Sequence, residues 1–401
     1  MQQIMTVKKA RHDVIVVGGG IAGVSAAVAA GRAGASVLLI EKGIHLGGLA
    51  TVGLISWYEP LCDGEGHKMI GGIAEELIRL ASSCGFDDLP EEWGGENSRE
   101  RKSRRYSTHF SPTLFALELD RYVRQAGVEL LFDTRATYPI MEGKVCRGML
   151  VENVGGRAFY PADVVIDATG DATVAFRAGI PCEVGDNYLC YVTHGFDHES
   201  AKQYAEDGNL VKFRCWRNSG ASLDGMGQPE GMKLFHGVTG EDVTEFLLIG
   251  RERMLAKYDA LDRKSCDMMM IPAMPQYRKV RRIIGKTNFD GTEEGRVYED
   301  SIGAIGDFRH PGRRFTVPYS ALYAEDFPNI LTAGRIISAG GDGWEITRVI
   351  PVCALTGHAA GIAAAMATKR EGDVTALPYA ELRTALEAAD VQFDIGGVPN
   401  C

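Results

Sequence analysis

The sequence predicts an α/β fold with a central parallel sheet, a β-meander and an inserted α+β lobe. Three observations support this class. An apolar strand pattern at residues 13–18 leads through a glycine turn into an alanine-rich helical segment. A second apolar strand pattern follows at residues 36–41. Residues 185–315 then form a long stretch of mixed, less regular pattern, which we expect to be the lobe.

The first strand, the helix and the second strand form a βαβ unit. We expect the helix to run from about Ile21 to Arg32 and Gly34 to end it. The unit occupies roughly 30 residues, enough for a parallel crossover, and such a crossover is right-handed. The arrangement therefore predicts a Rossmann-like domain.

The later elements follow from periodicity and turn residues. Helices are expected over 73–84, from Ser111-Pro112 to Gly127, over 242–260, over 354–368 and over 379–389. Apolar runs at 128–133, 145–151 and 163–168 indicate a short β-meander that returns to the parallel sheet, and a further strand is expected at 330–333.

These elements divide the chain into a discontinuous domain and its insertions. The nucleotide-binding domain is predicted to comprise residues 11–60, 111–184 and 316–370. Residues 61–110 and 185–315 are assigned to the inserted substrate lobe, and residues 371–401 to a C-terminal helix and tail.

Composition excludes several functional classes. The 401 residues carry a net charge of -10, which disfavours a nucleic-acid-binding surface. The nine cysteines include no C-x-x-C pair, so we expect reduced thiols and no metal site. No run of about 20 apolar residues suggests a membrane span, and no apolar leader opens the chain. We therefore expect a soluble, cytoplasmic protein.

A dinucleotide motif follows the first strand. Gly18 permits a tight turn, Gly20 leaves room for a pyrophosphate beside the backbone, and Gly23 allows close helix–strand packing. The helix start offers free N–H groups to phosphate. Glu41, at the end of the second strand, can accept hydrogen bonds from both ribose hydroxyls. These four residues indicate an adenine dinucleotide, either NAD or FAD.

Three further segments favour FAD over NAD. A second glycine pair, Gly47-Gly48, suggests that the chain continues beside an extended pyrophosphate. The turn at 167–171 (DATGD) follows another apolar strand. The segment 329–338 (NILTAGRIIS) is a strand that ends in Ala-Gly-Arg, ahead of a helix that could direct its N-terminus at the flavin.

Taken together, these motifs resemble the FAD-dependent oxidoreductase family, which is distantly related to fumarate reductase and glutathione reductase flavoproteins. The G-G-G-x-A-G motif is matched by residues 18–23, the R-R-I-x-G motif by residues 281–285, and the closing A-G-R, R-V-x-P and G-x-A-A-G motifs by residues 333–335, 348–351 and 357–361. From the motifs and this resemblance, the predicted FAD-binding residues are Gly18, Gly20, Ile21, Ala22, Gly23, Glu41, Lys42, Gly47, Gly48, Leu49, Ala50, Thr51, Ala136, Ala168, Thr169, Gly170, Gly334, Arg335, Arg348, Val349 and Pro351.

The reaction expected from this resemblance is hydride transfer at the flavin N5 between FAD and a small organic substrate, with an external electron acceptor. A second NAD(P)H motif and a cysteine pair after Gly48 are both lacking, which argues against disulfide-reductase chemistry. Two alternatives stay open. One is a non-redox enzyme of the thiazole-synthase type, and the other is the flavoprotein subunit of an electron-transfer complex. The substrate, the direction, the acceptor and a homodimeric state are equally open.

Candidate catalytic residues come mainly from the lobe. Arginines suit bidentate binding of a carboxylate, and histidines suit proton transfer. The catalytic candidates are Arg281, Arg282, His194 and His310, with His236 and Arg278 considered beside them. Arg348, which the resemblance places beside the flavin pyrimidine, is expected to stabilise the reduced flavin.

Four weaker hypotheses concern other segments. His45 precedes the Gly47-Gly48 pair and is a candidate for covalent FAD attachment. Tyr319 and Trp344 are candidates for the flavin border. The basic run at 99–105 could form a lid that attracts anionic substrates, and the three methionines at 268–270 suggest adaptable core or a subunit contact.

Overall fold

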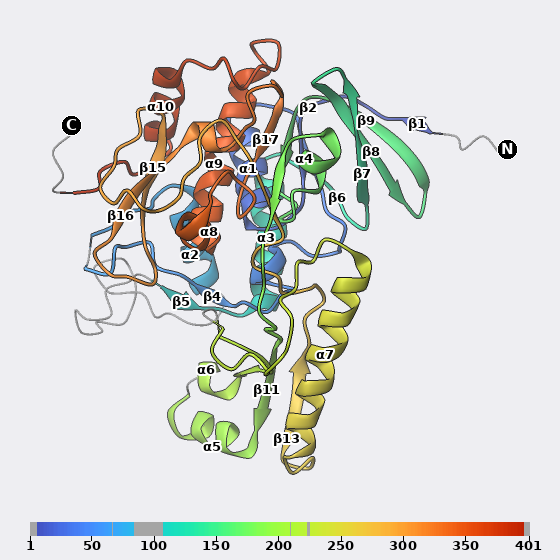
Figure 1. Ribbon diagram of the computed structural model, residues 1–401, viewed down its shortest axis with the longest axis vertical. Coiled ribbons are helices and arrows are strands. Elements are labelled where there is room, and N and C mark those ends of the chain that lie inside the picture. The colour runs from blue at the N-terminus through green and yellow to red at the C-terminus, as the bar shows by residue number, and fades with distance from the viewer. Residues whose placement is uncertain (1–5, 66, 84–106, 209, 223–224, 397–401) are drawn as a thin grey trace.

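A computed structural model describes residues 6–65, 67–83, 107–208, 210–222 and 225–396. Its largest sheet has the order β6-β3-β2-β9-β8-β7, and β17 and β1 also pair with β9 (Figure 1). The pairs β6–β3, β3–β2, β2–β9 and β9–β17 are parallel. The strands of this parallel part are β2 (His12–Val17), β3 (Val37–Ile40), β6 (Glu129–Leu131), β9 (Gly156–Asp167) and β17 (Ile330–Thr332). This confirms the predicted α/β class.

The two faces of the parallel sheet are buried under different layers. Alternate residues of a strand point to opposite faces, so Val14 and Val16 pack in the main core while Ile15 and Val17 pack in a second cluster. The helices on the main-core side are α1 (Ile21–Arg32), α2 (Ile73–Ser82), α3 (Pro112–Gln125) and α9 (Ile350–Ala367). Both faces of the nucleotide-binding sheet are therefore buried.

The β-meander covers the second cluster, but its strands differ from the prediction. The meander consists of β7 (Arg135–Glu142), β8 (Val145–Asn153) and the first half of β9, paired antiparallel. The run at 128–133 was expected to open the meander, and that assignment is wrong, because β6 pairs with β3 in the parallel sheet. The sequence did not predict strand β7, because Pro139 and several exposed side chains interrupt its apolar alternation.

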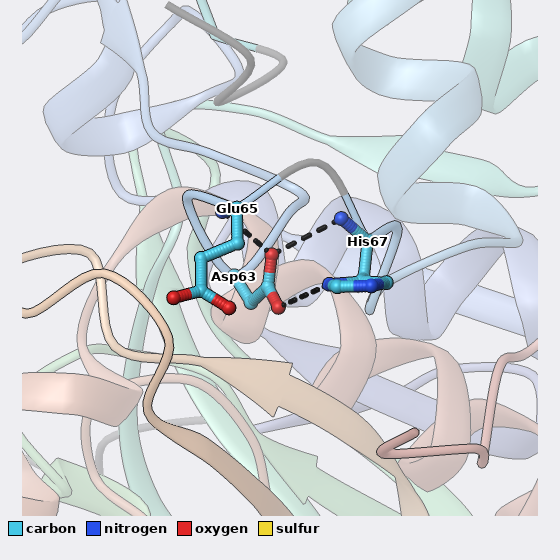
Figure 2. A group of neighbouring side chains, drawn as sticks. All are labelled: Asp63, Glu65 and His67. Carbon is cyan, nitrogen blue, oxygen red and sulfur yellow. Dashed lines mark hydrogen bonds and ion pairs between the residues drawn. The ribbon is translucent and has the colours of Figure 1, made fainter. Parts of the chain in front are cut away.

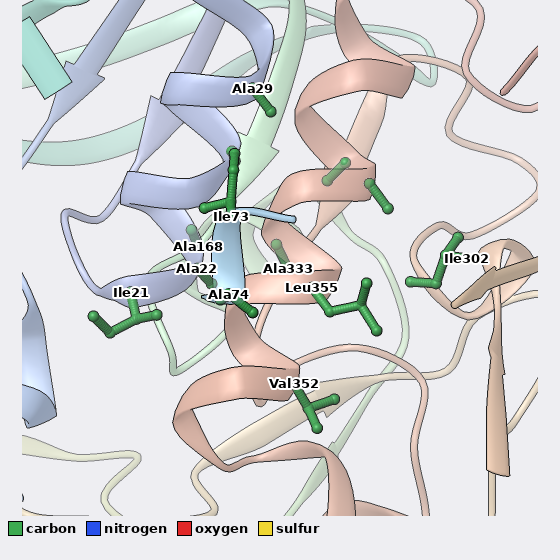
Figure 3. Packing of buried hydrophobic residues seen from close by; sticks show 14 of the residues in the cluster. Ile21, Ala22, Ala29, Ile73, Ala74, Ala168, Ile302, Ala333, Val352 and Leu355 are labelled. Carbon is green, nitrogen blue, oxygen red and sulfur yellow. The ribbon is translucent and has the colours of Figure 1, made fainter. Parts of the chain in front are cut away.

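Helices α1 and α9 approach each other unusually closely (Figure 3). A Cβ at Gly357 would lie 2.2 Å from the carbonyl oxygen of Ala22, and a Cβ at Gly361 would lie 2.2 Å from that of Ala26. The glycines of the closing G-x-A-A-G motif therefore allow α9 to pack closely against α1.

Within the described chain, α9 alone has the length and composition of a membrane-crossing helix, and 89% of it is buried in the fold.

A smaller lobe projects below the main body in Figure 1 and has clusters of its own. Its three-stranded sheet has the order β12-β11-β13, flanked by α7. The elements are β11 (Val192–Asp197), α5 (His198–Asp207), α6 (Leu210–Phe213), β12 (Cys215–Asn218), α7 (Gly240–Asp259) and β13 (Cys266–Met270). Phe289, Ile302 and Phe315, by contrast, pack in the main core rather than in the lobe clusters.

The remaining elements are short and link these parts. They are β1 (Val7–Lys8), the 3-10 turn η1 (Gly48–Ala50), β4 (Trp57–Tyr58), β5 (Thr108–His109), α4 (Thr173–Ala178), β10 (Cys182–Val184), β14 (Arg281–Ile283), β15 (Ser301–Gly306), β16 (Arg314–Pro318), the 3-10 turn η4 (Tyr319–Ala321), α8 (Gly341–Thr347) and α10 (Tyr379–Ala388). The sequence reading did not predict α4 or α8, each of which is shorter than eight residues.

Candidate active site

The N-terminus of α1 forms the first part of the site. Gly18 has a φ of 103°, and a Cβ there would lie 2.5 Å from the carbonyl oxygen of Ala168. A Cβ at Gly23 would lie 1.8 Å from the carbonyl oxygen of Gly18. Gly20, the N-cap residue, receives no side-chain cap, and no described atom lies within 4 Å of a Cβ built there. The helix start is thus open to a phosphate group at Gly20.

Glu41 lies directly beside this turn. Its carboxylate accepts hydrogen bonds from the backbone N–H of Gly19 and of Gly43, both at 2.6 Å. The side chain is only partly buried. A carboxylate fixed in this way at the end of a strand has remaining lone pairs for ribose hydroxyls. The neighbouring Lys42 is exposed and contributes positive charge near Asp171.

The second glycine segment runs alongside the first. Gly47 forms a parallel bridge with Gly20 and donates its N–H to the carbonyl oxygen of Gly19 at 2.8 Å. A Cβ at Gly48 would lie 3.1 Å from the Cα of Gly20. Leu49 and Ala50 continue into η1, and the hydroxyl of Thr51 caps this turn on the carbonyl oxygen of Leu46. The two glycine motifs therefore form one continuous backbone edge.

The turn that follows β9 closes the site from another side. Arg335 donates from Nε to the carbonyl oxygen of Gly170 at 2.7 Å. The pKa of the buried Asp167 is raised to about 6 by burial, although Thr169 donates to it. The pKa of Asp171 is held below its ordinary value because Lys42 and a hydrogen bond from Thr173 outweigh its burial.

The other predicted FAD residues surround this edge. Ile21 and Ala22 are buried on α1, and a Cβ at Gly334 would lie 2.9 Å from Ala22. Ala136 lies two residues after Thr134, whose N–H donates to the carbonyl oxygen of Glu41. Val349 and Pro351 stand at the start of α9. An open helix start, an anchored carboxylate and a glycine edge fit the ADP half of FAD.

A group of arginines lies where the lobe meets α8 and α9. Arg278 and Arg348 line a small cavity of about 50 Å³, which we call the arginine cavity, and its other lining residues are Asp186, Asn187, Tyr188, Cys190, Ser222, Gln276, Lys279 and Glu345. Arg335 contributes a further positive charge near both arginines. A larger hollow of about 580 Å³ follows the outer face of α7, but its lining includes no arginine, lysine or histidine.

Of the cations that line the arginine cavity, Arg348 and Lys279 form ion pairs and Arg278 forms none in the described ranges. Glu345 accepts from Nε of Arg348 at 2.7 Å and forms an ion pair with Lys279 at 2.8 Å. Arg278 donates to the carbonyl oxygen of Gln276 at 3.3 Å, and no ion pair to it occurs within the described ranges. Burial, with repulsion from Arg348, lowers the pKa of the Arg278 guanidinium. Arg278 is therefore the cation best placed to take an external anion.

Glu59 is a buried carboxyl group close enough to Arg348 and Arg278 to feel their charge. It was not among the site residues predicted from the sequence. The residue is 8% exposed, and its Oε2 accepts from the backbone N–H of Ile350, the first residue of α9, at 3.3 Å. Burial raises the pKa of Glu59, and the positive charges of Arg348 and Arg278 oppose this only in part. One signal was available, because Glu59 is the one charged residue in a largely apolar stretch (residues 54–62), and a charge is costly to bury without partners.

Arg281 and Arg282, the two arginines predicted to be catalytic, lie away from the arginine cavity. Arg282 is 8% exposed, binds Asn288 at 2.9 Å and Glu183 at 2.5 Å, and braces β14 against β10. Arg281 contacts the carbonyl oxygen of Asp171 at 3.4 Å and stacks on Phe176. Neither arginine lines the arginine cavity. Their catalytic role stays a prediction, since the geometry gives both of them contacts within the fold.

The predicted histidines are dispersed. His194 is 1% exposed, and its Nε2 lies 3.1 Å from the carbonyl oxygen of Leu54, so it joins the lobe to the segment after η1. His310 is largely exposed and paired with Asp307 at 2.8 Å. His236 lies 3.1 Å from Asp186, a residue that lines the arginine cavity. His45 is exposed.

Other predicted residues also have defined contacts. Tyr319 is buried and donates to the carbonyl oxygen of Val374, in the segment between α9 and α10. Trp344 donates from its indole nitrogen to the carbonyl oxygen of Arg335 at 2.7 Å, close to the arginine cavity. Met268 and Met270 are partly buried and Met269 is exposed. The basic run at 99–105 lies outside the described residues.

Asp63, Glu65 and His67 form the one group of metal-type ligands found in the described parts of the chain (Figure 2). Asp63 accepts hydrogen bonds from the backbone of Glu65 and from Nδ1 of His67. Arg314 also reaches this group, with its Nε 2.8 Å and its Nη2 2.7 Å from Asp63 Oδ2. The guanidinium already supplies the positive charge that these carboxylates need.

The family of the chain is decided by a family model described as FAD dependent oxidoreductase, which matches residues 13–218 and 242–386. The chain belongs to this family. FAD is its cofactor, and it is an oxidoreductase. The matched ranges include every motif of the nucleotide site and both arginines of the cavity.

Two curated relatives carry reductase names. A digeranylgeranylglycerophospholipid reductase of Methanoculleus marisnigri is 31% identical over 180 residues, covering 43% of this chain and 42% of the relative. A vinyl phenol reductase of Lactiplantibacillus plantarum is 56% identical over 134 residues, covering 33% of this chain and 24% of the relative. The aligned part thus spans less than half the length of either relative.

Similarity to solved structures is broad but loose. A geranylgeranyl bacteriochlorophyll reductase-like protein from Thermoplasma acidophilum overlaps 95% of this chain and 84% of its own, at 14% identity and a TM-score of 0.47. The p-nitrophenol 4-monooxygenase of Pseudomonas putida overlaps 95% and 89%, at 13% identity and a TM-score of 0.49. Overlaps this loose transfer no substrate to this chain.

Proposed function

We propose that this FAD-dependent oxidoreductase is a reductase that adds a hydride and a proton across a carbon–carbon double bond of a small molecule with an anionic or phenolic oxygen. The arrangement of Arg278 carries the proposal, because this guanidinium lines the arginine cavity and forms no ion pair with a carboxylate in the described ranges. The reductase names of the relatives favour reduction, and a vinyl group is itself a carbon–carbon double bond.

The residues of the cavity suit a ligand of this kind. Its volume of about 50 Å³ corresponds to roughly one or two water molecules, so it suits the charged group of a ligand rather than a whole ligand. Arg278 can form paired hydrogen bonds to a planar oxyanion, and Gln276 lies at the same wall. Binding there would fix the position of the double bond relative to the rest of the site.

Bound FAD supplies the hydride chemistry at N5. Gly20 and Glu41 would hold the nucleotide half, and Arg335 and Arg348 would offer positive charge to the bound cofactor. Reduction also needs a proton, and Glu59 is a buried group able to hold one near this cavity. The alternative of a non-redox enzyme of the thiazole-synthase type has no support from the family match, which names an oxidoreductase.

A half-reaction tests this function. The FAD-loaded protein is reduced chemically without oxygen, mixed with vinylphenols and with unsaturated carboxylic acids, and followed by the return of oxidised flavin absorbance. We expect at least one unsaturated compound to reoxidise the flavin and yield its saturated product, while the saturated analogues leave it reduced. If the unsaturated compounds leave it reduced and their saturated counterparts bleach the oxidised protein instead, the proposed direction is wrong.

A further inference from the structure

The start of α9 brings a carboxyl group and two arginines from three separate parts of the chain together. Glu59 follows β4, Arg348 is the C-cap residue directly after α8, and Arg278 comes from the segment that returns from the lobe. Glu59 binds the first N–H of α9, and Arg348 lies two residues earlier in the chain. The protonation of Glu59 and the net charge of the arginine cavity are therefore coupled.

The groups that act on Glu59 come from the lobe segment, from the residue after α8 and from the start of α9. Arg348 and Arg278 act on it with positive charge, the N–H of Ile350 donates to it, and Cys353 lies on the first turn of α9. The pKa of Cys353 is raised to about 12 by burial, so this thiol stays protonated at neutral pH. The two arginines are therefore the charged groups that oppose protonation of Glu59.

We propose that Glu59 takes up a proton when an anion binds to Arg278 in the arginine cavity, so that ligand binding loads the site with the proton that reduction requires. The physical reason is linkage. A bound anion compensates the positive charges that favour the Glu59 carboxylate and removes water from them, so the neutral acid gains stability. This inference deepens the proposed function, because it rests on an anion-binding role for the same cavity.

Burial supports the direction of the effect. Glu59 is 8% exposed and its carboxylate has one backbone donor at 3.3 Å besides its own N–H. A buried carboxylate with so few donors depends strongly on nearby cations for its charge. Glu345, by comparison, is ion-paired to both Lys279 and Arg348, and its pKa is held below its ordinary value by Arg348 despite burial. Glu59 is thus the carboxyl group that responds to a ligand.

The test measures the affinity of the FAD-loaded protein for nitrate, a small planar oxyanion that does not titrate in the working range. Nitrate binding is followed by calorimetry or by the shift of the flavin spectrum between pH 6 and pH 9. We expect the affinity to fall with rising pH, by up to about tenfold per pH unit, with proton uptake from the buffer. Glu59→Gln should keep nitrate binding but lose the pH slope and the uptake.

Two further variants serve as controls. Arg278→Gln should lose nitrate binding, whereas Glu75→Gln, which removes a carboxylate from the α2 ion pair with Lys68, should leave both affinity and slope unchanged. The wild-type slope is informative by itself if Glu59→Gln does not fold. Three results would each overturn the inference. They are a nitrate affinity that does not depend on pH in the wild type, the same pH dependence in Glu59→Gln, and unchanged nitrate affinity in Arg278→Gln. An intact nitrate linkage in a protein that reduces no alkene would remove the proposed reaction alone.

Discussion

The nucleotide half of the site and the arginine cavity are built in opposite ways. At the nucleotide half, Gly18, Gly20 and Gly23 lie within six consecutive residues, and backbone groups make nearly all the contacts. At the arginine cavity, Glu59, Arg278 and Arg348 come from positions far apart in the chain, and side chains make the contacts. We therefore expect the nucleotide half to be disrupted by substitutions that add side-chain atoms, and the arginine cavity by substitutions that change charge.

The largest expected effect concerns the glycine turn. Gly23→Ala would place a Cβ 1.8 Å from the carbonyl oxygen of Gly18, so we expect a loss of about 3 kcal/mol or more and little folded protein. Gly20→Ala is the matched control, because no described atom lies within 4 Å of its Cβ. It should fold normally and retain much less FAD. Thermal melts measure stability and flavin absorbance measures FAD content in both variants. Equal losses of stability in the two variants would contradict the assignment of Gly23 to packing and Gly20 to FAD binding.

The next effect is a pH dependence of stability in the α9 core. His358 is 3% exposed, and burial lowers its pKa to about 4. The folded protein keeps it neutral while the unfolded chain binds a proton below about 6.5, so stability falls as the pH drops from about 6.5 to 4. The loss should approach about 3 kcal/mol. His358→Gln should remove most of this slope in urea melts, and an unchanged slope would contradict the assignment.

A smaller effect is expected at the cavity. Arg278→Gln should raise KM for the anionic or phenolic substrate by about 10- to 100-fold, the cost of one charge-assisted pair, and leave FAD content unchanged. Arg278→Lys should recover part of this loss, since it keeps the charge but not the planar donor pair. Steady-state kinetics and flavin absorbance separate these outcomes. Loss of FAD together with substrate affinity would show that the two halves of the site are not independent.

The smallest effect is expected for Arg281. Its contacts are a 3.4 Å approach to the carbonyl oxygen of Asp171 and the ring of Phe176. Arg281→Ala should change kcat/KM by less than about threefold and stability by less than about 1 kcal/mol. Kinetics and a thermal melt check this. A large fall in kcat with an unchanged melt would restore the catalytic role predicted from the sequence.

Much of the fold could be predicted because its signals are local. Apolar alternation and glycine turns gave the βαβ unit, and Ser111 with Pro112 marked the start of α3, where Ser111 caps the helix as expected. The strand β7 was missed because its exposed edge and Pro139 weaken the alternation. Its existence depends on pairing with β8 rather than on its own residues.

The sequence by itself determined the cofactor and the family, because glycine spacing and a strand-end carboxylate act through neighbouring backbone. Only the tertiary structure decided that Arg278, rather than Arg281 or Arg282, faces the cavity, and that Glu59 lies at the start of α9. The physical reason is that burial and charge environment depend on contacts across hundreds of residues. Glu59 and Ile350 are 291 positions apart in the chain, which leaves no local pattern to read.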